Sequence, residues 1–320
     1  MHQAGFQTPP AWGVRKSYKC NILGENMPLD VRDARLLDLV DAAADIEQIA
    51  TGCQFTEGPL WHATGQFLLF SDIPANKMRK WDAETGMTVF RDPSGKSNGL
   101  TYDKGGHLIA CEHANRRVSL TTADGEILTI ASHYQDKRLN SPNDIVVKSD
   151  GSIYFTDPPY GLSAAYGAES EKELDFQGVY RLSSDYETLT LLVDDFDRPN
   201  GICFSPDESI LYINDTERMH VRAFDVQPDG TIANDRIFGV EEGDGGKPDG
   251  MKVDVQGNVY LTGPDGIWVF APDGTHLGII LVPERAANLA WGGDDWKTLF
   301  ITASTSVYRV ACKTVGVAVP

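Results

Sequence analysis

Along most of the chain, short runs of alternating apolar and polar residues are separated by turns rich in Gly, Asp and Pro. Segments such as SIYFTD and ILYIND are rich in Ile, Tyr, Phe and Thr, and this alternation is typical of half-buried β-strands. Helical spacing of apolar residues occurs in 32–44, outside the strand-rich part, where it predicts a short helix. The pattern as a whole predicts an all-β protein.

The strand pattern repeats six times. Each copy starts with a small residue or Pro, then Asn, Asp or Glu, usually Gly, and an apolar strand. The copies contain the segments TEGPLW, SNGLTY, PNDIVV, PNGICF, PDGMKV and ANLAWG, whose acidic or amide residues lie 39 to 57 positions apart. Four short strands in each of six copies are typical of the blades of a propeller. We therefore predict an all-β, six-bladed β-propeller.

The sixth copy ends near Cys312 with three strands, so its sheet needs a partner from elsewhere in the chain. We expect residues 46–50 to supply the closing outer strand, which would also remove an exposed sheet edge. This interpretation divides the chain into an N-terminal extension, 1–45, and a single propeller domain, 46–320. Two domains of three copies each are less favoured because no linker composition interrupts the series.

The repeats place one polar side chain per blade at the mouth of the central channel, because the innermost strand of each blade lines that channel. These residues are Glu57, Asn98, Asn143, Asn200, Asp249 and Asn288. Turn chemistry explains one such Asn or Asp, but not six in register. All six carry oxygen atoms, which suit Ca²⁺ first, and Mg²⁺ or Mn²⁺ next. The two carboxylates would also suit Zn²⁺ in an open catalytic site.

Further candidates follow from the strand order, because second strands return to the same face of the ring. Asp215 ends one of them, and His113 directly follows another. The third copy has a long loop, DPPYGLSAAYGAESEKELDFQ, which contains Tyr160 and is a candidate lid.

Composition narrows the possible functions. The 28 Lys and Arg against 46 Asp and Glu give a net charge of −18, which disfavours nucleic-acid binding. No apolar run approaches the roughly 18 residues that a membrane span needs. Five scattered cysteines and the lack of a visible signal peptide favour a cytoplasmic location. The sequence has no GxSxG or HExxH motif, so a serine hydrolase or a zincin is not indicated.

The segments FTEGPLW, SPNDIVV, YFTDPPYG, RPNGICFSPDE and KPDGMKVD resemble the gluconolactonase, regucalcin (senescence marker protein) and lactone-esterase family. The similarity covers about residues 46–312, and CEHANRRV and DPPYG are nearer to the bacterial gluconolactonases. The resemblance implies a propeller with a divalent cation in its channel that hydrolyses sugar lactones. It implies Glu57, Asn200 and Asp249 as metal ligands and Asn143 as a residue facing substrate or metal. Regucalcins carry Arg where this chain has Ser141, which leaves the preferred lactone open.

The expected reaction is attack of water on a lactone carbonyl polarised by the cation. Asp249, or a hydroxide on the cation, takes the proton, with Asp215 as the alternative base. We expect Asn98, Asn143, His113 and Tyr160 to contact the substrate. The protein is expected to be a monomer or homodimer. The alternatives are a non-catalytic binding propeller and a cation-dependent aryl-esterase or phosphotriesterase.

Overall fold

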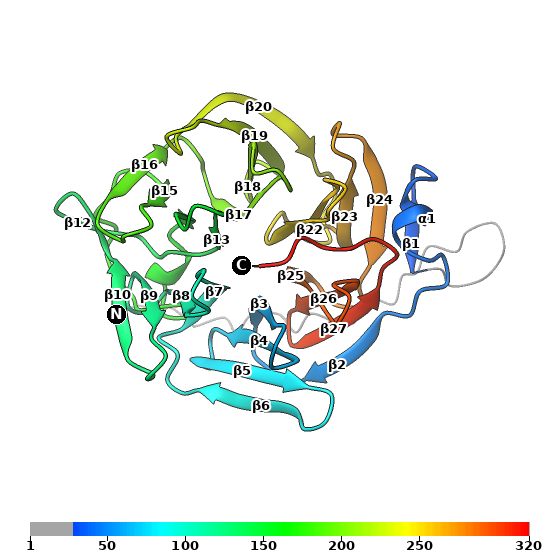
Figure 1. The fold of residues 1–320 in the computed structure, drawn as a ribbon, viewed down its shortest axis with the longest axis horizontal. Coiled ribbons are helices and arrows are strands. Elements are labelled where there is room, and N and C mark those ends of the chain that lie inside the picture. The colour runs from blue at the N-terminus through cyan, green and yellow to red at the C-terminus, as the bar shows by residue number, and fades with distance from the viewer. Residues whose placement is uncertain (1–27, 320) are drawn as a thin grey trace, which may run out of the picture.

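The computed structural model describes residues 28–319 and arranges their strands as six antiparallel sheets around a central axis (Figure 1). In each sheet the strands follow one another outward, with the first strand nearest the axis. The prediction of an all-β, six-bladed propeller is confirmed. We number the blades one to six along the chain.

Blade one contains β3 (Thr56–His62), β4 (Phe67–Asp72), β5 (Lys77–Asp82) and β6 (Gly86–Arg91). Blade two contains β7 (Ser97–Tyr102), β8 (Leu108–Glu112), β9 (Arg117–Thr121) and β10 (Ile127–Ala131). A hairpin of β11 (His133–Tyr134) and β12 (Lys137–Arg138) precedes blade three, which contains β13 (Ile145–Val147), β14 (Ile153–Asp157), β15 (Gly178–Leu182) and β16 (Leu189–Val193).

Blade four contains β17 (Pro199–Phe204), β18 (Ile210–Asp215), β19 (His220–Val226) and β20 (Ile232–Val240). Blade five contains β21 (Met251–Val253), β22 (Val259–Gly263), β23 (Gly266–Phe270) and β24 (His276–Leu281). Blade six contains β25 (Ala286–Gly292), β26 (Thr298–Ala303) and β27 (Ser306–Ala311).

The N-terminal part of the described chain closes the propeller. Strand β2 (Glu47–Thr51) pairs antiparallel with β27 and completes blade six, as predicted for residues 46–50. Strand β1 (Leu29–Val31) adds a fifth strand to blade five through β24, which the sequence pattern did not indicate. The predicted helix is present but short, as α1 (Leu36–Leu39).

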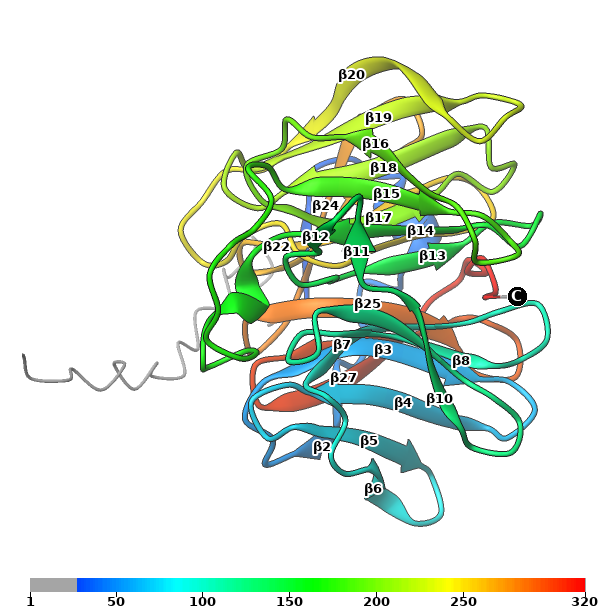
Figure 2. The same cartoon turned by 90° about the vertical axis from the view of Figure 1, so that its left-hand side faces the viewer.

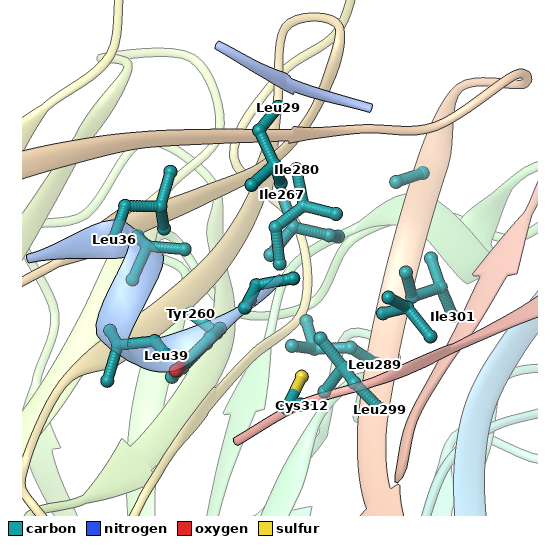
Figure 3. Close-up of a cluster of buried hydrophobic side chains, with 14 of the residues drawn as sticks. Leu29, Leu36, Leu39, Tyr260, Ile267, Ile280, Leu289, Leu299, Ile301 and Cys312 are labelled. Carbon is teal, nitrogen blue, oxygen red and sulfur yellow. The ribbon is translucent and has the colours of Figure 1, made fainter. Parts of the chain in front are cut away.

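Residues 29–40 belong to the hydrophobic core of blades five and six. Leu29, Leu36 and Leu39 are buried against a cluster that includes Ile267 and Ile280 (Figure 3). The sequence boundary at residue 45 is therefore no break in packing. Cys20 lies in residues 1–27, outside the described residues. Cys53, Cys111, Cys203 and Cys312 are buried and free.

The Gly that follows most of the channel-facing polar residues has a steric reason. Gly58 has φ 51°, and a Cβ there would collide with the backbone carbonyl of Asn98 in the next blade. The same close approach lets Gly99 N donate to Asn143 O at 2.8 Å and Gly201 N to Asp249 O at 3.0 Å. Adjacent blades are thus joined by backbone hydrogen bonds at the level of the polar residues, which fixes where those side chains start.

The C-terminal segment crosses the opposite end of the channel. Val255 N donates to Val315 O at 2.9 Å, and Val317 N donates to Val253 O at 3.2 Å. Val319 packs against the buried cluster of blades one and two. The described C-terminal end lies near the axis in Figure 1, and Figure 2 shows it on the face away from the short 3-10 turn η1 (Tyr160–Leu162). One mouth of the channel is therefore covered by this tail, and the polar residues line the other. No helix among residues 28–319 is long and apolar enough to cross a membrane.

Candidate active site

The six predicted polar side chains meet at one mouth of the channel, and we call them the axial ring: Glu57, Asn98, Asn143, Asn200, Asp249 and Asn288. Five of the six are at most 4 % exposed, and Asp249 is partly exposed. Asp249 is therefore the ring member with the most contact with solvent.

The amide members of the axial ring are oriented by one another. Asn98 Nδ2 donates to Asn143 Oδ1 at 2.7 Å, and Asn143 Nδ2 donates to Asn200 Oδ1 at 2.6 Å. Asn200 Nδ2 continues to Thr216 Oγ1 at 3.0 Å. The direction of donation is the same at each step, so the amide oxygens of successive blades are held in a defined orientation.

The two carboxylates of the axial ring carry the charge. Glu57 Oε2 accepts from Asn288 Nδ2 at 2.9 Å and from Gly58 N at 2.8 Å. Burial raises the pKa of Glu57 to about 7. Burial, and then the negative charge of Glu57, raises the pKa of Asp249 well above its usual range. Two desolvated carboxylates that repel each other would be stabilised by a bound cation.

The donor set fits a hard divalent cation. Carboxylate and amide oxygens are the ligands that Ca²⁺ and Mg²⁺ prefer. Among residues 28–319 no three His, Cys, Asp or Glu side chains converge, so the described chain offers no thiolate or imidazole site instead. Glu57, Asn200 and Asp249, the metal ligands implied by the family resemblance, contribute two carboxylates and one amide to this donor set.

A lysine supplies an internal positive charge close to the axial ring. Lys252 Nζ lies 3.9 Å from Asp144 Oδ2, and it lowers the pKa of Glu57 while burial raises it. Asp144 directly follows Asn143 and is 3 % exposed. The sequence pattern did not single out Lys252, because it comes from blade five and Asp144 from blade three.

His113 lies beside the axial ring and contacts two of its amides, Asn98 and Asn143. It is 1 % exposed, and burial lowers its pKa to about 4, so the neutral imidazole is the form at neutral pH. Nε2 lies 3.2 Å from Asn143 Oδ1 and 3.4 Å from Asn98 Nδ2, and Nδ1 lies 3.2 Å from Tyr166 O. In the tautomer whose Nδ1–H donates to Tyr166 O, Nε2 is the acceptor that faces the axial ring. That tautomer can accept a hydrogen bond from a substrate hydroxyl.

The first part of the predicted lid contacts Lys96 and His113 beside this mouth. Lys96 Nζ donates to the backbone oxygens of Ala164, Ala165 and Gly167 at 2.7, 3.3 and 3.0 Å. We call residues 158–170 the lid loop. Ser141 is completely buried and forms hydrogen bonds with the backbone of Pro158 and Gly161 in this loop.

Tyr160 of the lid loop has a buried hydroxyl with no hydrogen-bond partner among the described residues. Burial, and then the charge of Asp249, raises the pKa of Tyr160, while the nearby Thr216 side chain lowers it. The hydroxyl therefore keeps its proton and is a donor close to the axial ring. Tyr160 was predicted as a substrate contact, and its unused donor is consistent with that role.

Asp215 is occupied by backbone contacts. Its carboxylate accepts from the backbone N–H groups of Asp197, Arg198, Glu217 and Arg218 at 2.8 to 3.2 Å. Asp72 and Asp157, which end the equivalent strands, also bind backbone N–H groups near the start of their blades. Thr216, which the sequence pattern did not single out, is the residue at this strand end that contacts the axial ring.

Comparison with known proteins identifies the class. Residues 55–305 match the SMP-30/Gluconolactonase/LRE-like region, so the chain belongs to this family. The gluconolactonase of Zymomonas mobilis is 36 % identical over 95 % of this chain and 92 % of its own length. The pentonolactonase XacC of Haloferax volcanii is 27 % identical over 80 % of this chain and 84 % of its own. A solved gluconolactonase structure from Xanthomonas campestris is 33 % identical, has a TM-score of 0.83, and covers 89 % of this chain and 94 % of its own.

Proposed function

We propose that this protein is a divalent-cation-dependent lactonase that hydrolyses sugar lactones, such as gluconolactone, to the open-chain acid. The observation that carries the proposal is the axial ring, where two desolvated carboxylates and four oriented amides converge on one channel mouth. The names of the gluconolactonase and pentonolactonase relatives support the substrate class.

A divalent cation held by Glu57, Asn200 and Asp249 would act as a Lewis acid on the lactone carbonyl, with Ca²⁺ as the first choice. The remaining tasks fall to the side chains. Asn98, Asn143 and Nε2 of His113 orient the sugar hydroxyls, and the buried hydroxyl of Tyr160 donates to the substrate from the lid loop.

Asp249 is the residue that we assign as general base. It is the partly exposed carboxylate of the axial ring, so a water molecule can reach it and transfer a proton to it. Water attacks the carbonyl carbon and loses its proton to Asp249. The C–O bond of the lactone then breaks, and the leaving alkoxide takes up that proton. We prefer Asp249 to Asp215 because the Asp215 carboxylate already accepts four backbone N–H groups.

The direct test is a lactone panel assayed with and without metal. Metal-stripped protein should be inactive, and Ca²⁺, Mg²⁺, Mn²⁺ or Zn²⁺ should restore hydrolysis to different degrees. Full activity in metal-free protein would contradict the cation requirement. Phenyl acetate and a fluorophosphate in the same panel test the aryl-esterase and phosphotriesterase alternative, and tight sugar binding without turnover would indicate the binding propeller. A cytoplasmic location and a monomeric or homodimeric state stay predictions.

A further inference from the structure

The rim of the mouth carries three basic residues, each two positions before a member of the axial ring. These are Lys96 before Asn98, Arg198 before Asn200 and Lys247 before Asp249. We call them the basic rim. They lie in a chain with 46 acidic residues, so each would be expected to have a partner.

Two members of the basic rim are satisfied. The Lys96 ammonium binds three backbone oxygens of the lid loop. The Lys247 ammonium forms an ion pair with Glu217 Oε2 at 2.6 Å. Both therefore have a structural explanation that does not require a ligand.

Arg198 differs from both. Among residues 28–319 its guanidinium has no hydrogen bond within 3.5 Å and no carboxylate within 4.0 Å, and its Nε is a buried atom without a partner. Asp215, whose carboxylate accepts the backbone N–H of Arg198, is paired with the side chain of Arg218 at 3.6 Å instead. A buried donor left without an acceptor costs free energy, so an acceptor is missing from this place.

The position of Arg198 is nevertheless fixed. Its backbone N–H donates to Asp215 Oδ1 at 3.1 Å, and its carbonyl accepts from Thr216 N at 3.0 Å. Its guanidinium carbon lies 5.5 Å from the centroid of the Tyr160 ring. The guanidinium is thus held against an aromatic face by a rigid backbone, as in a built binding site.

Tyr160 brings a second unused donor to the same wall. Like Nε of Arg198, its hydroxyl is buried and has no hydrogen-bond partner among the described residues. A neutral hydroxyl of a sugar would satisfy Tyr160, but a planar guanidinium is best matched by a carboxylate or phosphate. The two donors together therefore select an anion.

We propose that Arg198 and Tyr160 form an anion subsite beside the axial ring, which binds a carboxylate or phosphate group on the part of the lactone remote from its carbonyl. This inference rests on the proposed lactonase function and narrows its substrate class to lactones of aldaric or phosphorylated aldonic acids. A carboxylate and a phosphate both offer negatively charged oxygen acceptors, and this is the chemistry that the subsite recognises.

The kinetic test compares three lactones on the metal-loaded protein: neutral D-glucono-δ-lactone, carboxylated D-glucaro-γ-lactone and phosphogluconolactone. The variants are R198Q, Y160F and a charge-matched control, R236Q. Arg236 lies on the outer strand β20 and pairs with Asp225 of β19. We expect the ratio of kcat/KM for an anionic lactone to that for the neutral lactone to fall roughly ten- to a hundredfold in R198Q. It should fall less in Y160F and stay unchanged in R236Q.

The two anionic lactones distinguish a carboxylate from a phosphate. The lactone whose kcat/KM ratio falls more in R198Q carries the group that the subsite binds. A ratio in R198Q equal to that of the wild type would overturn the subsite while leaving the lactonase proposal intact. If no lactone is hydrolysed, the lactonase proposal fails. Calorimetric binding of D-glucarate then decides the subsite: weaker binding to R198Q than to wild type and R236Q supports it, and equal binding overturns it.

Discussion

Asn288 Nδ2 donates to Glu57 Oε2 at 2.9 Å, although the two residues are 231 positions apart in the chain. This bond joins the inner strand of blade six to that of blade one, at the level where the axial ring forms. The pairing of β2 with β27 closes the same junction at the outside of the propeller. One of the two hydrogen bonds that orient the Glu57 carboxylate therefore forms only when the ring of blades is closed.

The substitution Glu57→Gln tests this carboxylate. Gln keeps an oxygen that can accept from Asn288 but removes the negative charge, so we expect the fold to survive while activity drops roughly 100-fold or more. Metal content, lactonase activity and the melting temperature measured on one preparation check this. Asn200→Ala should lower activity and metal content in the same way. Full activity in both variants would rule out the assigned ligands.

Asp249→Asn and Asp215→Asn form a matched pair. Asp249→Asn should lower activity by about 10²–10⁴-fold, the usual contribution of a general base, with little loss of stability. Asp215→Asn should keep its activity but lose stability. An amide cannot accept all four backbone N–H groups, which should lower the free energy of unfolding by about 1–3 kcal/mol. Denaturation curves and kcat of the two variants distinguish these roles. An inactive but fully stable Asp215→Asn protein would support Asp215 as the base instead.

The sequence predicted the blades and the axial ring because both are encoded by repetition. Each copy carries its own turn, its own strands and one acidic or amide residue at a fixed place, so the position of Glu57 or Asn200 follows from the blade alone. The closing strand, Glu47–Thr51, was predictable because blade six lacks its fourth strand. Local periodicity was sufficient for these features.

Contacts between blades were not predictable in the same way. Strand β1 pairs with β24 about 250 residues away, and Lys252 lies beside Asp144 of a different blade. The end of the second strand shows the limit at the site: alternation placed Asp215 at the mouth, but could not show that its carboxylate turns to backbone N–H groups while Thr216 contacts Asn200. Such choices depend on side-chain packing between segments that the repeat does not relate.

Ser141→Arg tests the lid loop and the choice of lactone together. Ser141 is completely buried, and its Oγ donates to Pro158 O at 2.5 Å and accepts from Gly161 N at 2.9 Å. An Arg has no room there unless η1 moves, so we expect a changed order of preference across a panel of aldonolactones. Ser141→Ala is the control, since it removes the two hydrogen bonds without adding bulk. Identical preferences in wild type and Ser141→Arg would contradict the expectation.

Lys96→Met tests whether the lid loop is held by its ammonium. Met has similar length but cannot donate to Ala164, Ala165 or Gly167, so the loop should open more often. We expect a higher KM, a smaller change in kcat, and faster amide hydrogen exchange within residues 158–170. Lys104→Met, which removes one hydrogen bond to Ser149 O elsewhere in the chain, is the matched control. Unchanged exchange in Lys96→Met would show that other contacts hold the loop.

Glu241 offers a test of pH-dependent stability away from the axial ring. It is 2 % exposed, neither carboxylate oxygen has a partner among the described residues, and burial raises its pKa well above the usual value. The native state therefore keeps a proton that the unfolded chain loses above pH ~4.3, the ordinary value for Glu. The contribution of Glu241 to the free energy of unfolding should be largest below that pH and fall by up to about 1.4 kcal/mol per pH unit until the native pKa is reached.

Glu241→Gln should remove this pH dependence and be more stable than the wild type at neutral pH. Glu242→Gln, at an exposed neighbouring position, is the control and should keep the pH dependence of the wild type. Urea denaturation between pH 5 and 8 measures the difference, and parallel curves for wild type and Glu241→Gln would show that Glu241 ionises normally in the folded protein.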